Sequence, residues 1–186
     1  SEFSGILSGH ADAHRAAREA GYQPVSSTIV LEANLNQPSP RDPKAVILRR
    51  QSQVSFHEEE LPRSWWESLA LGDFHPTLVR LSSKADAEII AQAGMWDMSW
   101  FGRADGLARV GIIHVEVASA FRRNGYGRFL IYEILRLARE QLFAVAQVQA
   151  NATNEAALAL YNSSGFQPID EATLYRLPAD RMERRG

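Results

Sequence analysis

The chain of 186 residues is long enough for one domain with a short extension, and a composition of 45% hydrophobic and 23% charged residues allows a sizeable apolar core. It contains no cysteine, which excludes a disulfide-bonded scaffold, a cysteine-ligated metal and a covalent acyl-cysteine intermediate. A net charge of −2 gives no general attraction to nucleic acid or membranes, and the sequence shows neither a long apolar run nor a signal-peptide pattern, so we expect a cytoplasmic protein.

The N-terminal part of the chain carries a weak internal repeat. The run AHRAAREAGYQPVSSTIVLE resembles the later run AALALYNSSGFQPIDEATLYRL, and both predict a helix, a glycine-aromatic turn and a strand. We interpret residues 1–33 as the remnant tail of an upstream module similar to the C-terminal half of this chain. An ordinary leading helix and strand is the alternative. The remnant has Ala17 and His10 where the later copy has Tyr161 and Asn154.

A linker and a main domain follow. Residues 34–43 contain three prolines and no periodicity, which indicates a linker. We assign residues 44–178 to the main domain and residues 179–186 to a C-terminal tail. Hydrophobic patterning predicts strands over 44–50, 77–82, 88–101, 108–117, 143–150 and 173–177, and helices over 62–71, 125–141 and 154–164. This alternation is typical of a mixed α/β fold.

The most informative segment is the run FRRNGYG at residues 121–127, between a predicted strand and a predicted helix. The first N–H groups of a helix have no intrahelical partner, and the helix dipole adds partial positive charge there. Gly125 and Gly127 let the backbone approach a ligand closely. Three arginines add charged donors for phosphate: Arg122, Arg123 and Arg128. The run is neither a P-loop nor a complete GxGxxG fingerprint, so we predict a pyrophosphate site of another class.

The pattern Arg-x-x-Gly-x-Gly in this run resembles the pyrophosphate loop of the GNAT superfamily, the acyl-CoA-dependent N-acyltransferases. A second run, NEAALALYNSSGF at residues 154–166, is similar to the family pattern N-x-x-A-x-x-L-Y-x-x-x-G-F. The resemblance is strong over residues 108–178 and extends more weakly back to residue 44. It implies an α/β (α+β) fold whose mixed, mostly antiparallel central sheet of six to seven strands is flanked by helices on both faces. Together with the N-terminal repeat, it suggests the C-terminal module of a tandem-GNAT protein.

The resemblance also implies acetyl-CoA (coenzyme A) as the cofactor, held by the pyrophosphate loop and by the edge of the strand before it. The residues assigned to cofactor binding in this way are Val115, Val117, Ala118, Arg122, Arg123, Asn124, Gly125, Tyr126, Gly127, Arg128, Asn154 and Tyr161. The backbone N–H of Val117 is expected to receive the thioester carbonyl oxygen. Asn154 is expected to cap its helix and to bind the cofactor arm, although capping alone would explain an asparagine there.

Catalytic roles follow from the same resemblance. Tyr161 is expected to protonate the departing thiolate, because a phenol with a pKa of about 10 suits a thiol leaving group; a core tyrosine is the alternative. Many relatives carry a glutamate as general base where this chain has Gly111, so that role cannot be carried over. Glu116 and His114 are the candidates, since they would share a strand face if no bulge intervenes. Proton loss to water without a base is the alternative, and we expect direct attack of the amine on the thioester.

No motif identifies the acceptor amine. Aromatic side chains and one carboxylate in the first half would suit a cationic or amphipathic amine, and packing alone explains them equally well: Trp65, Trp66, Trp96, Trp100 and Asp97. We assign no metal site, because His57 and the three glutamates after it are typical of a solvated acidic loop. The expected partners are acetyl-CoA and an amine, without nucleic acid or membrane, and a homodimer would use exposed edge strands.

Three functions compete at this point. The first is an N-acetyltransferase that acetylates a primary amine of a small molecule or peptide. The second is a non-catalytic module that binds acyl-CoA and regulates a tandem protein. The third is a structural pairing domain with a vestigial site. The complete pyrophosphate loop with Asn154 and Tyr161 favours the first, whereas the missing glutamate at Gly111 keeps the second open.

Overall fold

The computed structural model describes residues 5–38, 40, 42–58, 76–99 and 106–178. Its elements follow in the order β1 (Ile6–Leu7), α1 (Ala11–Glu19), β2 (Gln23–Asn34), α2 (Ala45–Gln51), β3 (Ser52–Glu58), β4 (Thr77–Ser83), β5 (Ile89–Asp97), β6 (Arg109–Val117), α4 (Tyr126–Glu140), β7 (Val145–Asn151), α5 (Glu155–Ser163) and β8 (Gln167–Arg176). A short 3-10 helix, Ser119–Phe121, lies between β6 and α4.

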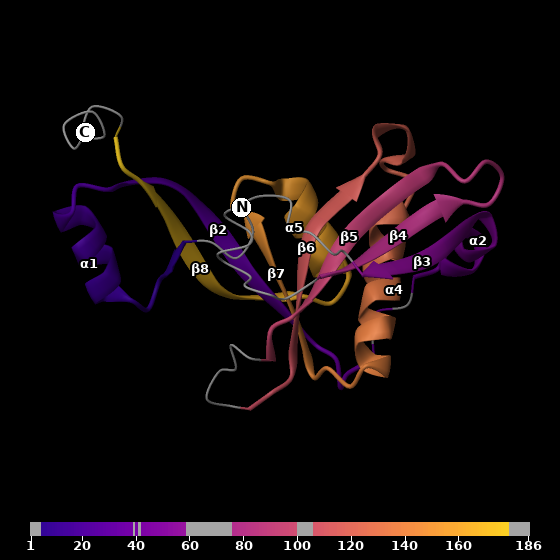
Figure 1. Cartoon of the computed structure of the whole chain (residues 1–186), viewed down its shortest axis with the longest axis horizontal. Coiled ribbons are helices and arrows are strands. Elements are labelled where there is room, and N and C mark those ends of the chain that lie inside the picture. Colours follow the sequence, from indigo (N-terminus) through magenta and orange to yellow (C-terminus); the bar gives the residue numbers. More distant parts are fainter. Residues whose placement is uncertain (1–4, 39, 41, 59–75, 100–105, 179–186) are drawn as a thin grey trace.

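All of these strands belong to one sheet in the order β1-β8-β2-β7-β6-β5-β4-β3 (Figure 1). Neighbouring strands are antiparallel except β6 and β7, which are parallel. The expected mixed, mostly antiparallel α/β fold is therefore confirmed. Within the described residues the sheet has eight strands, whereas six or seven were expected. The extra strands come from the N-terminal segment: β2 lies between β7 and β8, and β1 lies at the far edge.

One predicted element is wrong. Residues 44–50 were expected to form a strand, but the helix α2 begins at Ala45 and the strand β3 begins only at Ser52. Periodicity alone cannot separate a helix from a strand in so short an apolar run. In α2 only Leu48 is buried, while Val46 and Ile47 face solvent. The helix expected over 62–71 lies outside the described residues.

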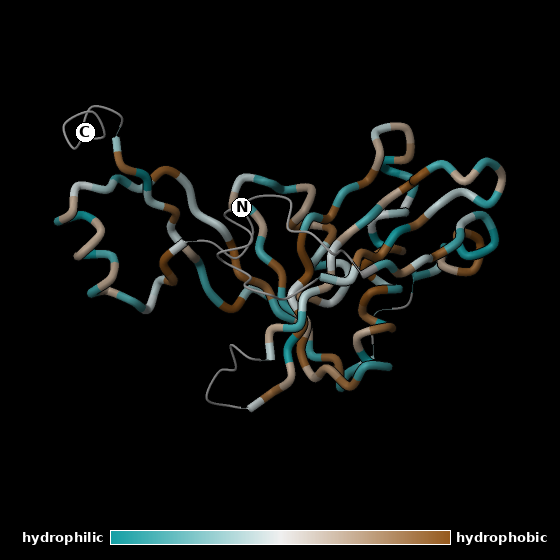
Figure 2. Tube along the Cα trace, in the orientation of Figure 1, coloured by the Kyte–Doolittle hydropathy of each residue, from teal (hydrophilic) through white to brown (hydrophobic). Residues whose placement is uncertain are grey.

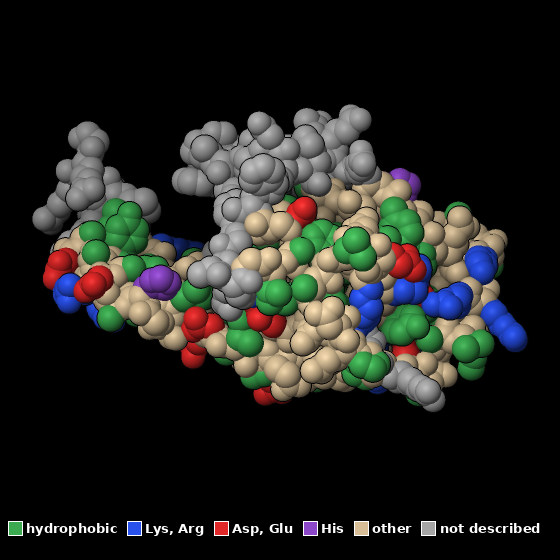
Figure 3. Space-filling view, turned by 90° about the horizontal axis from the view of Figure 1, so that it is seen from below, with side chains coloured by type: hydrophobic (Ala, Val, Ile, Leu, Met, Phe, Trp, Pro, Cys, Tyr) green, Lys and Arg blue, Asp and Glu red, His purple; other side chains and the backbone are tan. Residues whose placement is uncertain are grey.

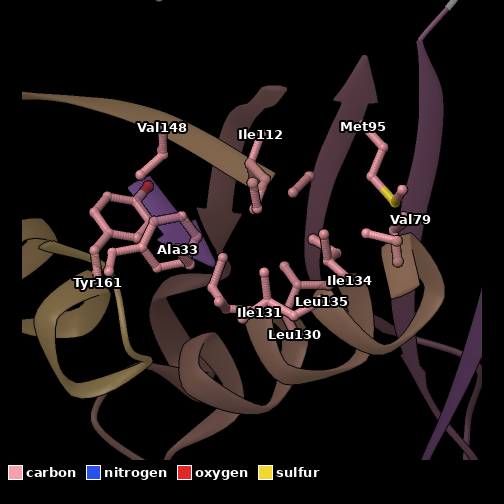
Figure 4. Packing of buried hydrophobic residues seen from close by; sticks show 14 of the residues in the cluster. Ala33, Val79, Met95, Ile112, Leu130, Ile131, Ile134, Leu135, Val148 and Tyr161 are labelled. Carbon is pink, nitrogen blue, oxygen red and sulfur yellow. The ribbon is translucent and has the colours of Figure 1, made fainter. Parts of the chain in front are cut away.

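The main core lies between the sheet and the helices α4 and α5 (Figure 4). One face of α4 is fully buried, and its largest side chains there are Phe129, Leu130, Ile131, Ile134 and Leu135. Hydrophobic residues concentrate in α4 and the central strands, whereas α1 is mostly hydrophilic (Figure 2) and contains no buried residue. The core therefore fixes α4 against β6, which is the arrangement that the predicted pyrophosphate site requires.

An ion-pair network joins α2 to α4. The carboxylate of Glu133 on α4 is almost fully buried and pairs with Arg49 of α2 and, at 3.0 Å, with Arg136. The hydrogen bonds from these guanidinium groups to Glu133 hold the pKa of Arg49 and Arg136 above the usual value. Lys and Arg side chains gather toward the end of the molecule that carries α2 (Figure 3). The network joins the C-terminal part of α2 to the middle of α4.

The α1–β2 and α5–β8 units repeat the same local geometry. Tyr22 N–H donates to the carbonyl of Ala17 at 2.9 Å, and Phe166 N–H donates to the carbonyl of Tyr161 at 3.1 Å, so both helices end in the same kind of cap. The strand registers repeat as well. On β2 and β7, Thr28 pairs with Asn151 and Ile29 with Ala150. On β8 and β1, Ala172 pairs with Leu7 and Thr173 with Ile6. Equivalent residues of the two sets of pairs therefore differ by 144 in residue number, as Thr28 and Ala172 do. The two glycines that follow the helices, Gly21 and Gly165, differ by the same number.

Candidate functional site

The predicted anion site lies at the N-terminus of α4. Gly125 precedes the helix with a φ of 94°, a left-handed conformation that costs a residue with a Cβ roughly 1–2 kcal/mol. The first intrahelical bond joins the N–H of Phe129 to the carbonyl of Gly125 at 3.0 Å. The N–H groups of residues 126–128 come before this bond and point out of the helix end. The first turn of α4 carries no acidic side chain that would compete with an anion.

Cationic side chains surround this helix end. Arg122 is exposed, and its Nε donates to the carbonyl of Val117 at 2.9 Å, which ties the loop to the end of β6. A Cβ built at Gly125 would lie 3.4 Å from Cδ of Lys44, so this lysine lies beside the start of α4. Sequence reasoning missed Lys44 because the residue was assigned to a strand rather than to the N-terminus of α2. The site therefore combines outward N–H groups with cations from two segments of the chain.

A slot opens where β6 and β7 separate. The two strands pair only from Arg109 with Val145 to Ile112 with Val148. Beyond these pairs β6 continues to Val117 and β7 to Asn151, with no mutual ladder in the described structure. The edge of β6 that faces β7 therefore offers backbone groups to a ligand with amide groups, as another strand would.

A β-bulge in β6 shapes the slot. Gln92 of β5 pairs with Glu116, but Gly94 pairs with Ile113, so β6 carries one residue more than β5 between these pairs. His114 lies within the bulge and has a φ of 53°. A side chain at position 94 would lie 2.7 Å from Cγ1 of Ile113, so the close contact at the bulge requires glycine. His114 and Glu116 were expected to share a strand face only if no bulge intervened, and this bulge lies at His114.

After the bulge, the side chains and N–H groups of β6 point in alternating directions. Val115 and Val117 pack against the core, whereas Glu116 is exposed and accepts a hydrogen bond from Nε2 of Gln92 at 3.4 Å. The N–H of Ala118 donates to the carbonyl of Ile90 on β5 at 2.9 Å. Successive N–H groups of a strand point to opposite sides, so the N–H of Val117 points away from β5 and toward the slot.

A cavity of about 250 Å³ occupies the slot. It brings together three of the predicted cofactor-binding residues: Val115, Asn154 and Tyr161. Only 5% of Tyr161 is exposed, and its ring packs edge-on against Phe166 with 5.7 Å between centroids. Figure 4 shows the phenol oxygen directed toward the part of the sheet that carries Val148. A buried phenol at a narrow cavity is suited to donate a proton to a leaving group there.

The N-terminal strand β2 also lines this cavity, through Ser26 and Thr28. The hydroxyl oxygen Oγ1 of Thr28 is buried and has no hydrogen-bond partner within the described part of the chain. A buried hydroxyl without a partner is costly, and a ligand in the slot would supply one. Sequence reasoning missed both residues because it assigned residues 1–33 to a separate module, and no local signal indicated that β2 inserts beside β7.

Asn154 lies at the mouth of the cavity and caps α5, where its Oδ1 accepts from the N–H of Ala157 at 3.1 Å. Two substitutions separate capping from cofactor binding. Asn154→Ala should lower the free energy of unfolding by about 1 kcal/mol because the cap is lost. Asn154→Asp should keep the stability, since aspartate caps as well, but should weaken acetyl-CoA binding because the amide donor is lost and a negative charge is gained. Thermal unfolding and isothermal titration measure the two effects, and unchanged binding in Asn154→Asp would leave capping as the only role.

The expected aromatic acceptor pocket is only partly described. Trp96 is buried with 5% of its surface exposed. Asp97 accepts a hydrogen bond from the N–H of Ser99 at 2.8 Å. Trp65, Trp66 and Trp100 lie outside the described residues. In the described ranges, no helix is long and apolar enough to cross a membrane, and no three His, Asp or Glu side chains cluster closely enough to hold a metal ion.

The chain resembles known proteins at the level of family and fold. The profile of the acetyltransferase (GNAT) family matches residues 45–166. No curated protein sequence matches the chain. Solved structures resemble it at low identity. One is a tandem GNAT protein from the clavulanic acid biosynthesis pathway, with a TM-score of 0.64, 13% identity and coverage of 93% of this chain. Another is a GCN5-related N-acetyltransferase from Sphaerobacter thermophilus, with a TM-score of 0.57, 15% identity and 92% coverage.

A third similar structure is a glucosamine N-acetyltransferase region in a fungal multi-domain GH3 β-N-acetylglucosaminidase, with a TM-score of 0.63, 15% identity and coverage of 93% of this chain. The present chain spans 60% of the tandem protein, 57% of the Sphaerobacter protein and 24% of the fungal protein. At these identities the likeness concerns the fold alone.

Proposed function

This chain belongs to the acetyltransferase (GNAT) family, and on that basis we propose that it transfers an acetyl group from acetyl-CoA to a primary amine of a small molecule or peptide. One arrangement carries the proposal: Val115 of β6 and Tyr161 line a single cavity where β6 and β7 separate, and the N-terminus of α4 lies beside the end of β6, where Gly127 approaches Val117. Acetyl-CoA supplies an acetyl group activated as a thioester. Its diphosphate suits the N–H groups of the loop 122–128, and its pantetheine amides suit the edge of β6.

Different groups of the chain would then serve the separate steps of the acetyl transfer. The N–H of Val117 would hold the carbonyl oxygen as negative charge develops there. Tyr161 would hold the proton that the departing sulfur takes. Glu116, on the exposed face of β6, is our proposed acceptor of the amine proton, directly or through water, and His114 at the bulge is the second candidate. Attack of the amine on the thioester is direct, since the chain has no cysteine to carry the acyl group.

Two measurements test this function. Isothermal titration should show that the chain binds acetyl-CoA with one site. Release of free thiol should then depend on an added amine, measured over a panel of diamines, amino acids, peptides and glucosamine, the last suggested by the printed name of the fungal structure. Binding without thiol release from any amine would contradict the enzymatic proposal and favour a non-catalytic acyl-CoA-binding module. Absence of binding would contradict both.

We also propose that residues 1–33 are the tail of an upstream GNAT-like module. The repeated caps and the constant offset of 144 residues support this proposal. The pairing of β1 with β8 repeats, in equivalent register, the pairing of β7 with β2. The corresponding site in that module would have Ala17 in place of Tyr161 and His10 in place of Asn154, so it would lack the proposed acid. Ala17 and His10 at these two positions of the repeat keep the regulatory alternative open. The homodimer is likewise a proposal, which light scattering would test.

A further inference from the structure

A row of residues crosses the sheet just before the slot. Register places Trp96, Gly111, Gln147, Glu32 and Gln167 next to one another on β5, β6, β7, β2 and β8. The neighbouring residues Ile112 and Val148 form the last pair before β6 and β7 separate. Because Ile112, Val148 and Ala33 face the core with α4 and α5, alternation puts this row on the opposite face of the sheet.

Glu32 is the carboxylate of this row. Its Oε1 accepts from Nε2 of Gln147 at 3.1 Å and from Nε of Arg109 at 3.4 Å. The side chains of Glu32 and Arg109 are only 17% and 6% exposed. Removing two charged side chains from water costs free energy, and two apolar side chains at these positions would often give a fold of equal stability. The buried ion pair between Glu32 and Arg109 is therefore weak evidence for a purely structural role.

A cavity of about 480 Å³ adjoins Glu32. Its polar lining comes from Glu32, Arg109, Asn34, Asn36, Gln37 and Gln167. Amide side chains offer both donors and acceptors, so this lining suits a ligand rich in hydroxyl or amide groups rather than an aromatic one. A volume of this size would hold a small molecule.

The cavity and the slot both border β7, the cavity at Val145 and the slot from Gln149 onward. Gln149 lines the slot, while Gln147 binds Glu32. Both side chains point to the same face, and two residues of a strand span about 7 Å. A small amine held near Glu32 would therefore lie close to the end of the slot beside Val148, toward which the phenol of Tyr161 is directed (Figure 4).

We propose that this cavity binds the acceptor, that Glu32 is the anionic anchor for its ammonium group, and that the acceptor is a small, polar primary amine bearing hydroxyl or amide groups. The inference rests on the proposed function and deepens it. Glu32 lies on β2, outside residues 45–166 that match the family. The strand β2 would thus supply a carboxylate near the bound acceptor, in the row where many relatives carry a glutamate at the position of Gly111.

Steady-state kinetics with serinol, a hydroxylated amine, and isopropylamine, its apolar counterpart, test the proposal. Glu32→Gln keeps an oxygen for Arg109 and Gln147 but removes the charge. We expect the KM for serinol to rise about tenfold while the KM for acetyl-CoA stays unchanged. Wild-type protein should prefer serinol to isopropylamine at equal concentrations of neutral amine. The matched control is Glu171→Gln, an exposed glutamate on β8 that lines neither cavity, and it should leave both KM values unchanged.

A second variant guards against misfolding. Asn34 and Gln167 are exposed lining residues, so the double variant Asn34→Ala, Gln167→Ala should retain the wild-type unfolding temperature. It should raise the KM for serinol several-fold and leave that for isopropylamine unchanged. Unchanged serinol kinetics in both variants would overturn the inference while leaving the acetyltransferase proposal intact. Failure of the wild-type protein to release thiol with any amine would instead contradict the proposed function.

Discussion

Replacement of Tyr161 by phenylalanine should lower kcat about a hundredfold and leave the Kd for acetyl-CoA unchanged. The substitution removes one oxygen from a ring that is 5% exposed and packed against Phe166, so the shape of the core is kept. The departing thiolate would lose its proton donor, and general acid catalysis typically contributes a factor of roughly 100 to 10,000. Thiol release under saturating acetyl-CoA and isothermal titration measure the two quantities.

The matched control is Tyr132→Phe. Tyr132 is a partly buried tyrosine of α4 that does not line the slot. We expect its kcat to stay within about twofold of wild type, since loss of a partly exposed hydroxyl is a small perturbation. If Tyr161→Phe keeps the wild-type kcat across the pH range, Tyr161 is a core residue and not the acid.

Replacement of Gly127 by valine should weaken acetyl-CoA binding by about tenfold to a hundredfold. A Cβ at this position would lie 3.4 Å from Cγ2 of Val117 and 3.5 Å from Cδ2 of Leu160, which leaves no room for two further methyl groups. Overpacking of this kind costs about 1–3 kcal/mol and would push the first turn of α4 away from the end of β6. The N–H groups that face the diphosphate would then lose their alignment.

Gly127→Ala provides the matched control, because its single Cβ makes only ordinary van der Waals contacts with the same two side chains. Its Kd should stay within a few-fold of wild type. Unfolding temperatures of both variants show whether α4 stays docked. Wild-type affinity in Gly127→Val would mean that the diphosphate does not use this helix end.

The C-terminal half of the fold could be predicted because its signals are local. Glycines, arginines and an amphipathic helix stand next to one another in residues 121–141, and the turn at Gly165 follows directly from its helix. The strand β4, the turn after it and the strands β5 and β6 were likewise expected within a few residues of their bounds.

The parts that could not be predicted depend on contacts between distant segments. The bulge at His114 arises from pairing with β5, so alternation within β6 alone could not establish whether His114 and Glu116 share a face. The place of β2 between β7 and β8 depends on pairing across more than a hundred residues, so Thr28 and Glu32 could not be assigned to a site. Lys44 was missed because the position of α2 is set by its contacts with α4.

A crystal structure of this chain with acetyl-CoA is the most direct test of the central claim. We predict diphosphate oxygens within hydrogen-bonding distance of the N–H groups of residues 126–128, and a thioester sulfur in the slot beside Tyr161. A diphosphate bound away from the start of α4, or a pantetheine arm outside the gap between β6 and β7, would contradict the account.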